Sequence, residues 1–470
     1  MVDNTDLERQ IIGQVWTSPE LYTNVERLCD FGSRFSGTES ERQARDFIQS
    51  KFEDYGLQNV RLATFDYLGW MRGEAELCIV QPGQQVLPSA ISLVYSPSTL
   101  ADGLRAAVVD VGMGTEAEYA CRGHTIRDRF VMATSDSPRG GRRIHRREKY
   151  GRAVAGGASG FLFANHLPGM LAPTGSLRAG ELAEIPAVGL SCEDSFTIRR
   201  FLRAEAPVEL KMRIHNQTGP AQFSHVIGEV PGKSDGHPDD GHGDGCGHSH
   251  VIVVGAHYDG HDISQAAVDD ASGTALVMEL ARLFAPLKGR LRRTIRFEAY
   301  AAEEIGVYGS TQYVNGLTES DIAVVDFMLN LDGAALGGER GLALQGLKEL
   351  LPLFTALARQ MGYPLSLSNT VNTASDHFPY LIRGVPNASL VASRPPGLGR
   401  GFGHTRADTL DKVDPVELRE SAMVAARLLL YLANHGESIG RKRTPEEVKQ
   451  ILIDRGLEEP LRAQGKWLFD

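Results

Sequence analysis

The chain has 470 residues, of which 42% are hydrophobic and 23% are charged, and its formal net charge is −10. This length exceeds what one simple hydrophobic core usually organises, so we expect two or three domains. The negative charge argues against a nucleic-acid groove, which normally shows a basic surface, and no apolar run approaches the ~20 residues that span a bilayer.

Two features bear on the compartment. The first ten residues, MVDNTDLERQ, lack the apolar stretch of a signal peptide. The five cysteines are scattered, odd in number and in no CxxC pair, which is no disulfide framework and fits a reducing compartment. We therefore expect a cytoplasmic protein without a membrane partner, or a chain given without its leader.

Residues 1–96 predict helices followed by strands. Ser18-Pro19 begins one helix, and a second extends from about Glu39 to Tyr55. Gly56 is expected to end this second helix in the left-handed backbone conformation. The alternating stretches Val60–Phe65 and Glu74–Val80 are typical of strands. We assign this region to the first part of an α/β domain.

Residues 97–206 have a different character. They hold four short strand-like runs, near residues 106–110, 129–134, 160–163 and 185–190, and one helix that ends near Ala158. We find no catalytic group of residues there and expect a β-rich accessory domain. The basic run Arg139–Arg147 is predicted to be a solvated loop or helix face.

Strands and helices alternate again over residues 207–435, as in an α/β sheet covered by helices. The predicted strands are Val251–Val254, Thr294–Ala301 and Phe327–Leu331, and the predicted helices are Ser272–Phe284 and Pro415–Asn434. Residues 436–470 form an extension with one short helix near Pro445–Ile453 and no evident chemistry. The fold class is therefore α/β, with a mixed sheet between helical layers.

Ligand-type side chains follow the predicted strands of this second half. They are His257 and Asp259, then Asp269 and Asp270, then Glu303 and Glu304, then Asp332, and finally His404. The carboxyl ends of strands in an α/β sheet form the usual rim of an active site. Each residue alone has a simpler interpretation as a helix cap, a turn residue or solvated charge. Together, at successive strand ends, they indicate one site.

Metal chemistry accounts for this set. Zinc binds imidazole nitrogen and carboxylate oxygen, and a catalytic zinc site keeps one position open. Two zinc ions require one bridging carboxylate and terminal ligands on each side, which two imidazoles and three carboxylates supply. Paired metal ions roughly 3.5–4 Å apart recur in hydrolases, including aminopeptidases. We expect two divalent metal ions, Zn²⁺ in each case.

The motifs resemble a known family. Gly255-Ala256-His257-Tyr258-Asp259, Val268-Asp269-Asp270-Ala271-Ser272-Gly273 and Ala302-Glu303-Glu304-Ile305-Gly306 look like signatures of the bacterial leucyl aminopeptidase family of zinc peptidases. This family also includes plasma glutamate carboxypeptidase and folate-hydrolysing carboxypeptidases. Asn330-Leu331-Asp332, Ser375–Pro379 and His404-Thr405 complete the order. The resemblance implies a zinc exopeptidase fold, and it makes residues 97–206 similar to the protease-associated domain often inserted in it.

The resemblance also implies roles. His257 and Asp332 would be terminal ligands on opposite metals, Asp269 would bridge them, and Glu304 and His404 would complete the two shells. Glu303 would be the general base that takes a proton from the water and passes it to the leaving amine. Asp259 would assist catalysis by accepting a hydrogen bond from His257 and fixing its tautomer.

Three departures from the family pattern stand out. Many members carry Tyr before the final histidine as an oxyanion donor, whereas this chain has Phe402-Gly403, so His377 becomes a candidate oxyanion or substrate contact. No residue identifies which end of a peptide is recognised. Residues 235–250 read DGHPDDGHGDGCGHSH, a His-rich tract between two predicted strands. It is either a neutral insertion, which we favour slightly, or a loop that gathers metal.

These observations favour a metal-dependent exopeptidase, most simply an aminopeptidase acting on peptides or small amides. A carboxypeptidase or dipeptidase of the same family is the alternative. A receptor-like or scaffold relative without metals would have lost ligands, and here all five are present together with Glu303. A third class is an amidohydrolase or cyclase acting on a non-peptide amide.

Overall fold

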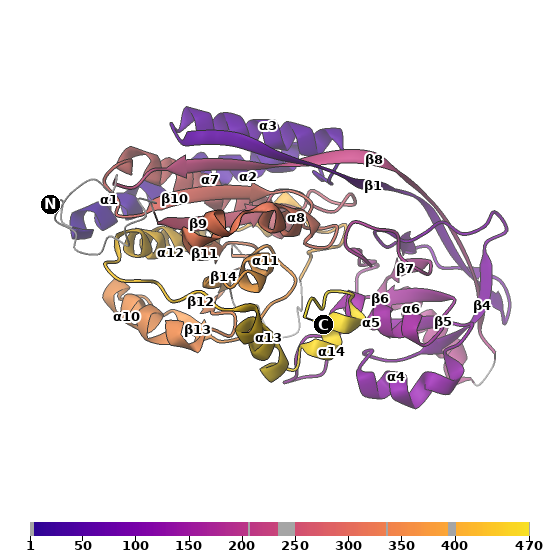
Figure 1. The fold of residues 1–470 in the computed structure, drawn as a ribbon. Helices are drawn as coiled ribbons and strands as arrows, with labels where there is room; N and C mark the ends of the chain where they lie inside the picture. The colour runs from indigo at the N-terminus through magenta and orange to yellow at the C-terminus, as the bar shows by residue number, and fades with distance from the viewer. Residues whose placement is uncertain (1–3, 205–206, 234–249, 335–336, 393–400, 470) are drawn as a thin grey trace.

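The computed structural model describes residues 4–204, 207–233, 250–334, 337–392 and 401–469. One mixed sheet of 14 strands runs through both halves of the molecule (Figure 1). Neighbouring strands follow the order β13-β12-β14-β11-β9-β10-β8-β4-β5-β6-β7-β3, and β1 and β2 pair beside this path. The predicted mixed sheet with helices on its faces is confirmed.

The half that holds the ligand-type residues has parallel strands at its centre, β10, β9, β11 and β14. Its strands are β8 (Glu209–Val230), β9 (Val251–His257), β10 (Thr294–Tyr300), β11 (Val325–Asn330), β12 (Arg340–Ala343), β13 (Ser366–Ser368) and β14 (Asn387–Ala392). Strand β9 pairs in parallel with β10 and β11, and its His257 is aligned with Tyr300. The carboxyl ends of these strands therefore meet at one edge of the sheet.

Helices cover both faces of this half. One face carries α1 (Asn4–Thr17), α2 (Glu20–Asp30), α3 (Glu39–Asp54), α7 (Ser272–Phe284), α10 (Leu351–Met361) and α12 (Pro415–Asn434). The other carries α8 (Tyr308–Gly316), α9 (Glu319–Ala323) and α11 (His377–Ile382). The predicted helices at residues 39–55, 272–284 and 415–434 are thus confirmed.

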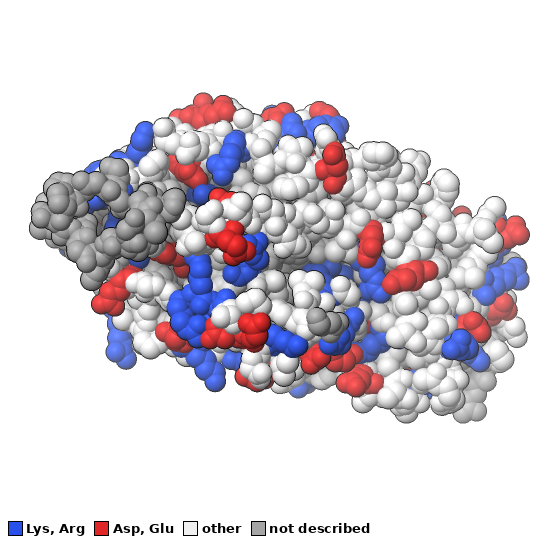
Figure 2. Space-filling view, in the orientation of Figure 1, with Lys and Arg blue, Asp and Glu red and all other residues white. Residues whose placement is uncertain are grey.

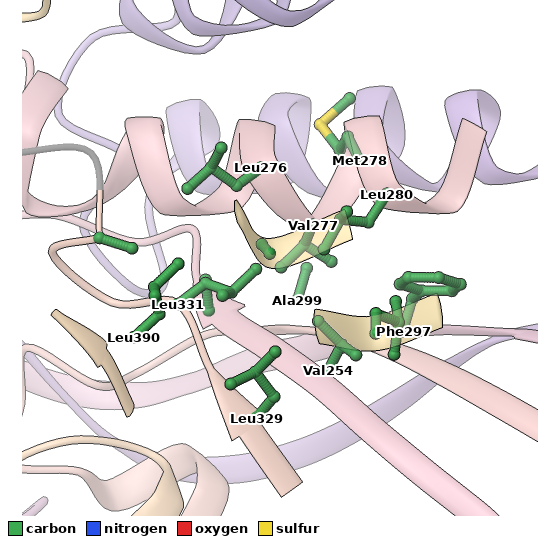
Figure 3. Close-up of a cluster of buried hydrophobic side chains, with 14 of the residues drawn as sticks. Val254, Leu276, Val277, Met278, Leu280, Phe297, Ala299, Leu329, Leu331 and Leu390 are labelled. Atoms are coloured by element: carbon green, nitrogen blue, oxygen red, sulfur yellow. The ribbon is translucent and has the colours of Figure 1, made fainter. Parts of the chain in front are cut away.

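Strand β9 shows how the core forms. Ile252 and Val254 belong to the larger cluster under α7, whereas Val251 and Val253 belong to the cluster on the opposite face. Successive side chains of a strand point to opposite faces, so a continuous apolar run fits a strand covered on both sides. Figure 3 shows Val254 among side chains of β10 and β11, below Leu276 and Leu280 of α7.

The second half combines strands with helices. Its elements are β3 (Ile91–Ser92), β4 (Leu104–Asp110), α4 (Glu116–Arg122), β5 (Phe130–Thr134), α5 (Arg146–Ala155), β6 (Gly160–Ala164), β7 (Ala187–Leu190) and α6 (Cys192–Arg203). Strands β4, β5, β6 and β7 are parallel neighbours. The region expected to be β-rich therefore contains helices between its parallel strands.

Two long strands connect the halves. Strand β1 (Gln58–Gln81) pairs antiparallel with β8 along most of its length, and β2 (Gln85–Val86) pairs with the end of β1. The sequence predicts two separate strands here, Val60–Phe65 and Glu74–Val80, with an interruption between them, whereas the structure has one continuous strand. The ladder with β8 absorbs this interruption as a bulge, where a Cβ on Gly73 would lie 1.8 Å from the His215 carbonyl oxygen.

The chain ends between the two halves. Helix α13 (Pro445–Asp454) confirms the predicted C-terminal helix, and α14 (Glu458–Ala463) lies beside α5 (Figure 1). The His-rich tract predicted at residues 235–250 lies outside the described residues, except for His250. Among the residues that are described, no helix combines the length and apolar character needed to cross a bilayer.

Candidate metal centre

The five predicted ligands converge at the carboxyl edge of the sheet. His257 ends β9, Asp269 precedes α7, Glu304 follows β10, and Asp332 follows β11. His404 comes from the loop before α12 and reaches the same place. All five side chains are buried except Asp332, which is partly buried. Residues far apart in the sequence thus form one polar cluster inside the protein.

The carboxylate of Asp269 lies between the two histidines. Its Oδ1 is 3.4 Å from His257 Nε2, and its Oδ2 is 3.3 Å from His404 Nε2. Each oxygen therefore faces a different imidazole. This is the arrangement that a carboxylate needs to bridge two metal ions.

The remaining ligands divide into two groups around this carboxylate. His257, Asp270 and Asp332 form one group, and His261, Glu304 and His404 form the other. In the second group, Glu304 Oε2 lies 3.1 Å from His404 Nε2 and 2.9 Å from His261 Nε2. Each group offers imidazole nitrogen and carboxylate oxygen within the reach of one ion.

The donor atoms and the buried charges of these side chains suit divalent metal ions. His404 Nε2 is buried and has no hydrogen-bond partner among the described residues, and neither has Asp270 Oδ2. Several carboxylates are gathered in the same interior, where unpaired charges are costly. The donor set is the imidazole and carboxylate set that zinc accepts. Cations bound there would satisfy these atoms and offset the negative charge.

Hydrogen bonds fix both histidine rings. His257 Nδ1 donates to the backbone carbonyl of Asp259 at 2.9 Å, while the Asp259 carboxylate is 3.5 Å away. His404 Nδ1 donates to the Thr174 carbonyl at 3.1 Å. Each bond leaves the Nε2 lone pair free to face a metal. The nearer acceptor of His257 is therefore the main chain of Asp259 and not the carboxylate to which the prediction assigns this hydrogen bond.

The Asp259 carboxylate holds the glutamate pair instead. Its Oδ1 accepts from Glu303 N at 3.1 Å, and its Oδ2 accepts from Glu304 N at 3.2 Å. Ser36 donates a further hydrogen bond to Oδ2. The buried carboxylate therefore connects the end of β9 to the turn after β10, where both glutamates begin.

The two glutamates have opposite electrostatic surroundings. Burial, opposed by the charge of His257 and reinforced by Glu304, raises the pKa of Glu303 well above its ordinary value. Against the effect of burial, His261 and His404 lower the pKa of Glu304. Glu304 is thus suited to remain an anionic ligand, whereas Glu303 is suited to hold and release a proton.

His261 is a site residue that the sequence reading missed. It lies in the loop that follows β9, four residues after His257. This second histidine so close to the first was the feature of the sequence that could have identified it. Burial, partly offset by Glu304, lowers the pKa of His261 to about 4, so the ring is neutral. A neutral imidazole beside Glu304 and His404 can serve as a ligand or orient the Glu304 carboxylate.

The basic run is only partly the solvated loop or helix face that we predict: Arg139, Arg142 and Arg143 are exposed, but its last two arginines are buried. Arg146 and Arg147 are only 6% and 2% exposed. Arg146 donates to the carbonyls of Thr174 and Ser176, and Arg147 donates to the carbonyl of Gly306. The fold places the start of α5 against the catalytic half, where Arg147 reaches the Gly306 carbonyl, while Arg146 binds carbonyls within residues 97–206. Residue type alone could not reveal this, because charged runs are usually exposed.

His377 is a buried histidine whose ring is held by hydrogen bonds inside the protein. Its Nε2 donates to the Asn372 carbonyl at 2.9 Å, and its Nδ1 lies 3.1 Å from Ser389 Oγ. The side chain is fully buried. With both ring nitrogens engaged, the geometry does not favour the predicted oxyanion or substrate contact.

A cleft of about 680 Å³ opens at the metal centre. Asp269, Asp332 and Gly403 line it from the catalytic half. Residues 141–145 of the other half and residues 455–464 of the C-terminal segment close its remaining sides. The cleft is therefore enclosed by all three parts of the chain.

Comparisons with known proteins agree with this site. Residues 241–429 match peptidase family M28. Aminopeptidase YwaD of Bacillus subtilis is 25% identical over 91% of this chain and 86% of its own length. Carboxypeptidase Q of Xenopus laevis is 24% identical over 93% of this chain and 91% of its own length.

Solved structures share the fold. The peptidase M28 precursor of Shewanella amazonensis has a TM-score of 0.75 at 25% identity, covering 94% of this chain and 99% of its own. BSAP, a zinc aminopeptidase from Bacillus subtilis, has a TM-score of 0.65 at 23% identity, covering 87% and 94%. The arrangement of both halves is thus found in known structures.

Proposed function

We propose that this chain, whose residues 241–429 match peptidase family M28, is a metal-dependent aminopeptidase that removes N-terminal residues from peptides. The observation that carries this function is the Asp269 carboxylate shared between His257 and His404, with Glu303 beside it. The relatives include carboxypeptidases as well. The test must therefore distinguish cleavage at the N-terminal end of a peptide from cleavage at its C-terminal end.

Divalent metal use follows from the family and from the two ligand groups. We infer that two zinc ions bind, one with His257 and Asp332 and the other with His404 and Glu304, and that Asp269 bridges them. Bound there, they would polarise the scissile carbonyl and lower the pKa of the bound water to roughly 7.

The protein's own groups then move the proton. Glu303 is buried beside the ligands and takes the proton of the attacking water. It returns this proton to the nitrogen of the leaving amine, which completes hydrolysis of the amide. Asp259 holds the backbone of both glutamates, so the base keeps its position while Glu304 remains a ligand.

We also propose that residues 97–206 are a protease-associated insert that shapes access to the cleft. Residues 141–145 in its wall support this role. Arg146, which lies 3.5 Å from His404 Nδ1, further suggests that the insert supports the metal centre.

The test is metal analysis together with a substrate series. Protein purified without chelator is expected to carry two divalent ions per chain. It is expected to cleave leucine p-nitroanilide and free-amine dipeptides but not their N-acetylated forms. Turnover of N-acetylated dipeptides would favour a carboxypeptidase instead. Active protein without any metal would end the proposal.

A further inference from the structure

The turn that carries the proposed base has a strained backbone. It comprises residues 302–307, between β10 and α8, and we call it the base turn because it includes Glu303. Ala302 and Val307 have φ angles of 61° and 60°. This left-handed conformation is uncommon for L residues and least favourable for a β-branched side chain. Such residues persist only where the surrounding structure holds them. The position of Glu303 therefore depends on contacts made to the base turn.

The catalytic half holds one end of the base turn. The Asp259 carboxylate accepts a hydrogen bond from Glu303 N at 3.1 Å. Within the turn, the N–H groups of Gly306 and Val307 donate to the Glu303 carbonyl, at 2.7 and 2.6 Å. These bonds leave the carbonyl groups of Ile305 and Gly306 for partners outside the turn.

The half that contains α5 holds the other end of the base turn. The Gly306 carbonyl accepts a hydrogen bond from Arg147 Nη1 at 3.2 Å, and the Ile305 carbonyl accepts one from Gly180 N at 3.2 Å. Gly306 has a φ angle of 118°, and an added Cβ there would lie 2.9 Å from Ala179 Cα. The two segments therefore approach so closely that glycine is required at this point.

Arg147 provides the side chain of this contact. It is the second residue of α5, which lies at the boundary between the two halves (Figure 1). Figure 2 shows several Lys and Arg side chains at the surface near the middle of the same view, whereas Arg147 is only 2% exposed. Its buried Nε has no hydrogen-bond partner among the residues that the structure describes. Burying a guanidinium is costly, so its place beside the base turn favours a role for the bond to Gly306.

We propose that Arg147 is a positioning residue for the general base. By holding the Gly306 carbonyl, it keeps the strained base turn in the conformation that directs Glu303 to the metal centre. Arg147 acts through the backbone of the turn and not through contact with the substrate. This inference rests on the proposed function, which makes Glu303 the base. Residues 97–206 thereby affect the rate of proton transfer as well as access to the cleft.

A double-mutant cycle between Arg147 and Glu303 tests this inference. Turnover of leucine p-nitroanilide, metal content and thermal unfolding are measured at saturating zinc. Arg147→Met is expected to lower kcat roughly 10–100-fold, because a shift of about 1 Å in a reacting group can slow a reaction about 100-fold. KM and metal content are expected to stay near their native values. In the Glu303→Gln background, where no base remains to be displaced, Arg147→Met is expected to lower kcat by less than about threefold.

Arg152→Met is the matched control. Arg152 belongs to the same helix, its side chain is only 9% exposed, and it also donates to a backbone carbonyl, that of Gly114. Its carboxylate partners, Glu148 and Glu459, lie outside the base turn. This variant is expected to keep the native kcat, even if its unfolding temperature falls.

Arg147→Lys is the second variant, for the case that Arg147→Met does not fold. Its ammonium keeps the charge and a donor for the Gly306 carbonyl, but it lacks the fixed geometry of the guanidinium. We expect kcat to fall below the native value, less than in Arg147→Met, and to fall only when Glu303 is present.

The outcomes separate the two proposals. If Glu303→Gln retains full activity, the proposed base is wrong and the mechanism proposed for this site fails. If every folded variant of Arg147 keeps the native kcat, or loses the same factor with and without Glu303, the positioning role is overturned. Loss of bound metal in these variants would assign Arg147 to the metal centre and would overturn the positioning role as well.

Discussion

Neighbouring residues of one type can have different roles when the fold gives them different surroundings. Glu303 and Glu304 follow the same strand, and the backbone N–H groups of both donate to the Asp259 carboxylate. Only Glu304 has two imidazoles against its carboxylate. This contrast, rather than the residue type, distinguishes a ligand from a base.

The glutamate pair yields the sharpest test of the mechanism. Glu303→Gln keeps the shape of the side chain but cannot accept the proton. We expect kcat to fall roughly 10²–10⁴-fold, the usual contribution of a positioned base, with metal content unchanged. Glu304→Gln is expected to weaken one metal site, with partial recovery in excess zinc. Turnover and metal content are measured from trace to saturating zinc.

Two results would contradict this assignment. If Glu303→Gln loses metal and Glu304→Gln keeps it, the two roles are reversed. If both variants retain full activity, the cluster is not the active site.

His261 provides a second residue-scale test. Because its Nε2 lies 2.9 Å from Glu304 Oε2, His261→Ala is expected to weaken one of the two metal sites by roughly 10–100-fold. Metal titration by calorimetry distinguishes the two sites. The control is His225→Ala, which removes another fully buried histidine that belongs to neither ligand group. Equal losses in both variants would show a general effect of unfolding.

At the scale of elements, helix α3 supports the end of β9, where His257 lies. The Glu41 carboxyl contacts the Tyr258 hydroxyl, and that hydroxyl lies 2.7 Å from the Ser224 carbonyl of β8. Glu41 is fully buried, and its Oε2 has no partner among the described residues. Burial, only partly offset by Tyr258, raises the pKa of Glu41 from 4.5 to about 7.

This shift predicts a pH dependence of stability. Between pH 4.5 and about 7 the folded chain binds more protons than the unfolded chain. The stabilisation is complete below pH 4.5 and is lost as pH rises through about 7. Relative to Glu41→Gln, the native protein is expected to lose about 1.4 kcal/mol per pH unit in this window. Urea unfolding at several pH values measures the difference.

The exposed Glu39, at the start of the same helix, is the control position. Glu39→Gln is expected to follow the native pH profile. A native profile in Glu41→Gln would show that this carboxyl does not cause the effect.

Helix α5, within residues 97–206, contacts the metal centre through its first residue, Arg146. Arg146 donates to the Thr174 carbonyl, which also accepts from His404. We expect Arg146→Met to raise the zinc concentration needed for activity by roughly tenfold, because the histidine loses part of its support. Activity is measured against free zinc. Arg139→Met changes an exposed member of the same basic run and is expected to have no effect.

At the scale of the whole molecule, the active site depends on segments that lie far apart in the sequence. The β1–β8 ladder connects the halves, and α14 packs against α5 across them. The catalytic half, residues 97–206 and the C-terminal segment all contribute residues to the wall of the cleft. Metal binding is therefore expected to stabilise the assembled protein.

Metal removal tests this coupling. A chelator is expected to lower the thermal unfolding temperature and abolish activity, because ions that bind only the folded state stabilise it. The effect is about 2.7 kcal/mol when free metal is 100 times its Kd. Zinc is expected to restore both properties. Asp269→Asn, which alters the shared carboxylate, is expected to show a smaller response to zinc. An unfolding temperature that does not change when the chelator is added would contradict the coupling between metal binding and stability.

Local patterns in the sequence determined the elements and most of the candidate ligands. Apolar periodicity identified β9, α7 and α12, and strand ends located His257, Glu303, Glu304 and Asp332, because parallel strands bring their carboxyl ends together. Only the tertiary structure brought His261 and Arg146 to the site. Their roles depend on contacts between distant segments, and a histidine in a loop or an arginine in a basic run has no local pattern that distinguishes it from a solvated side chain.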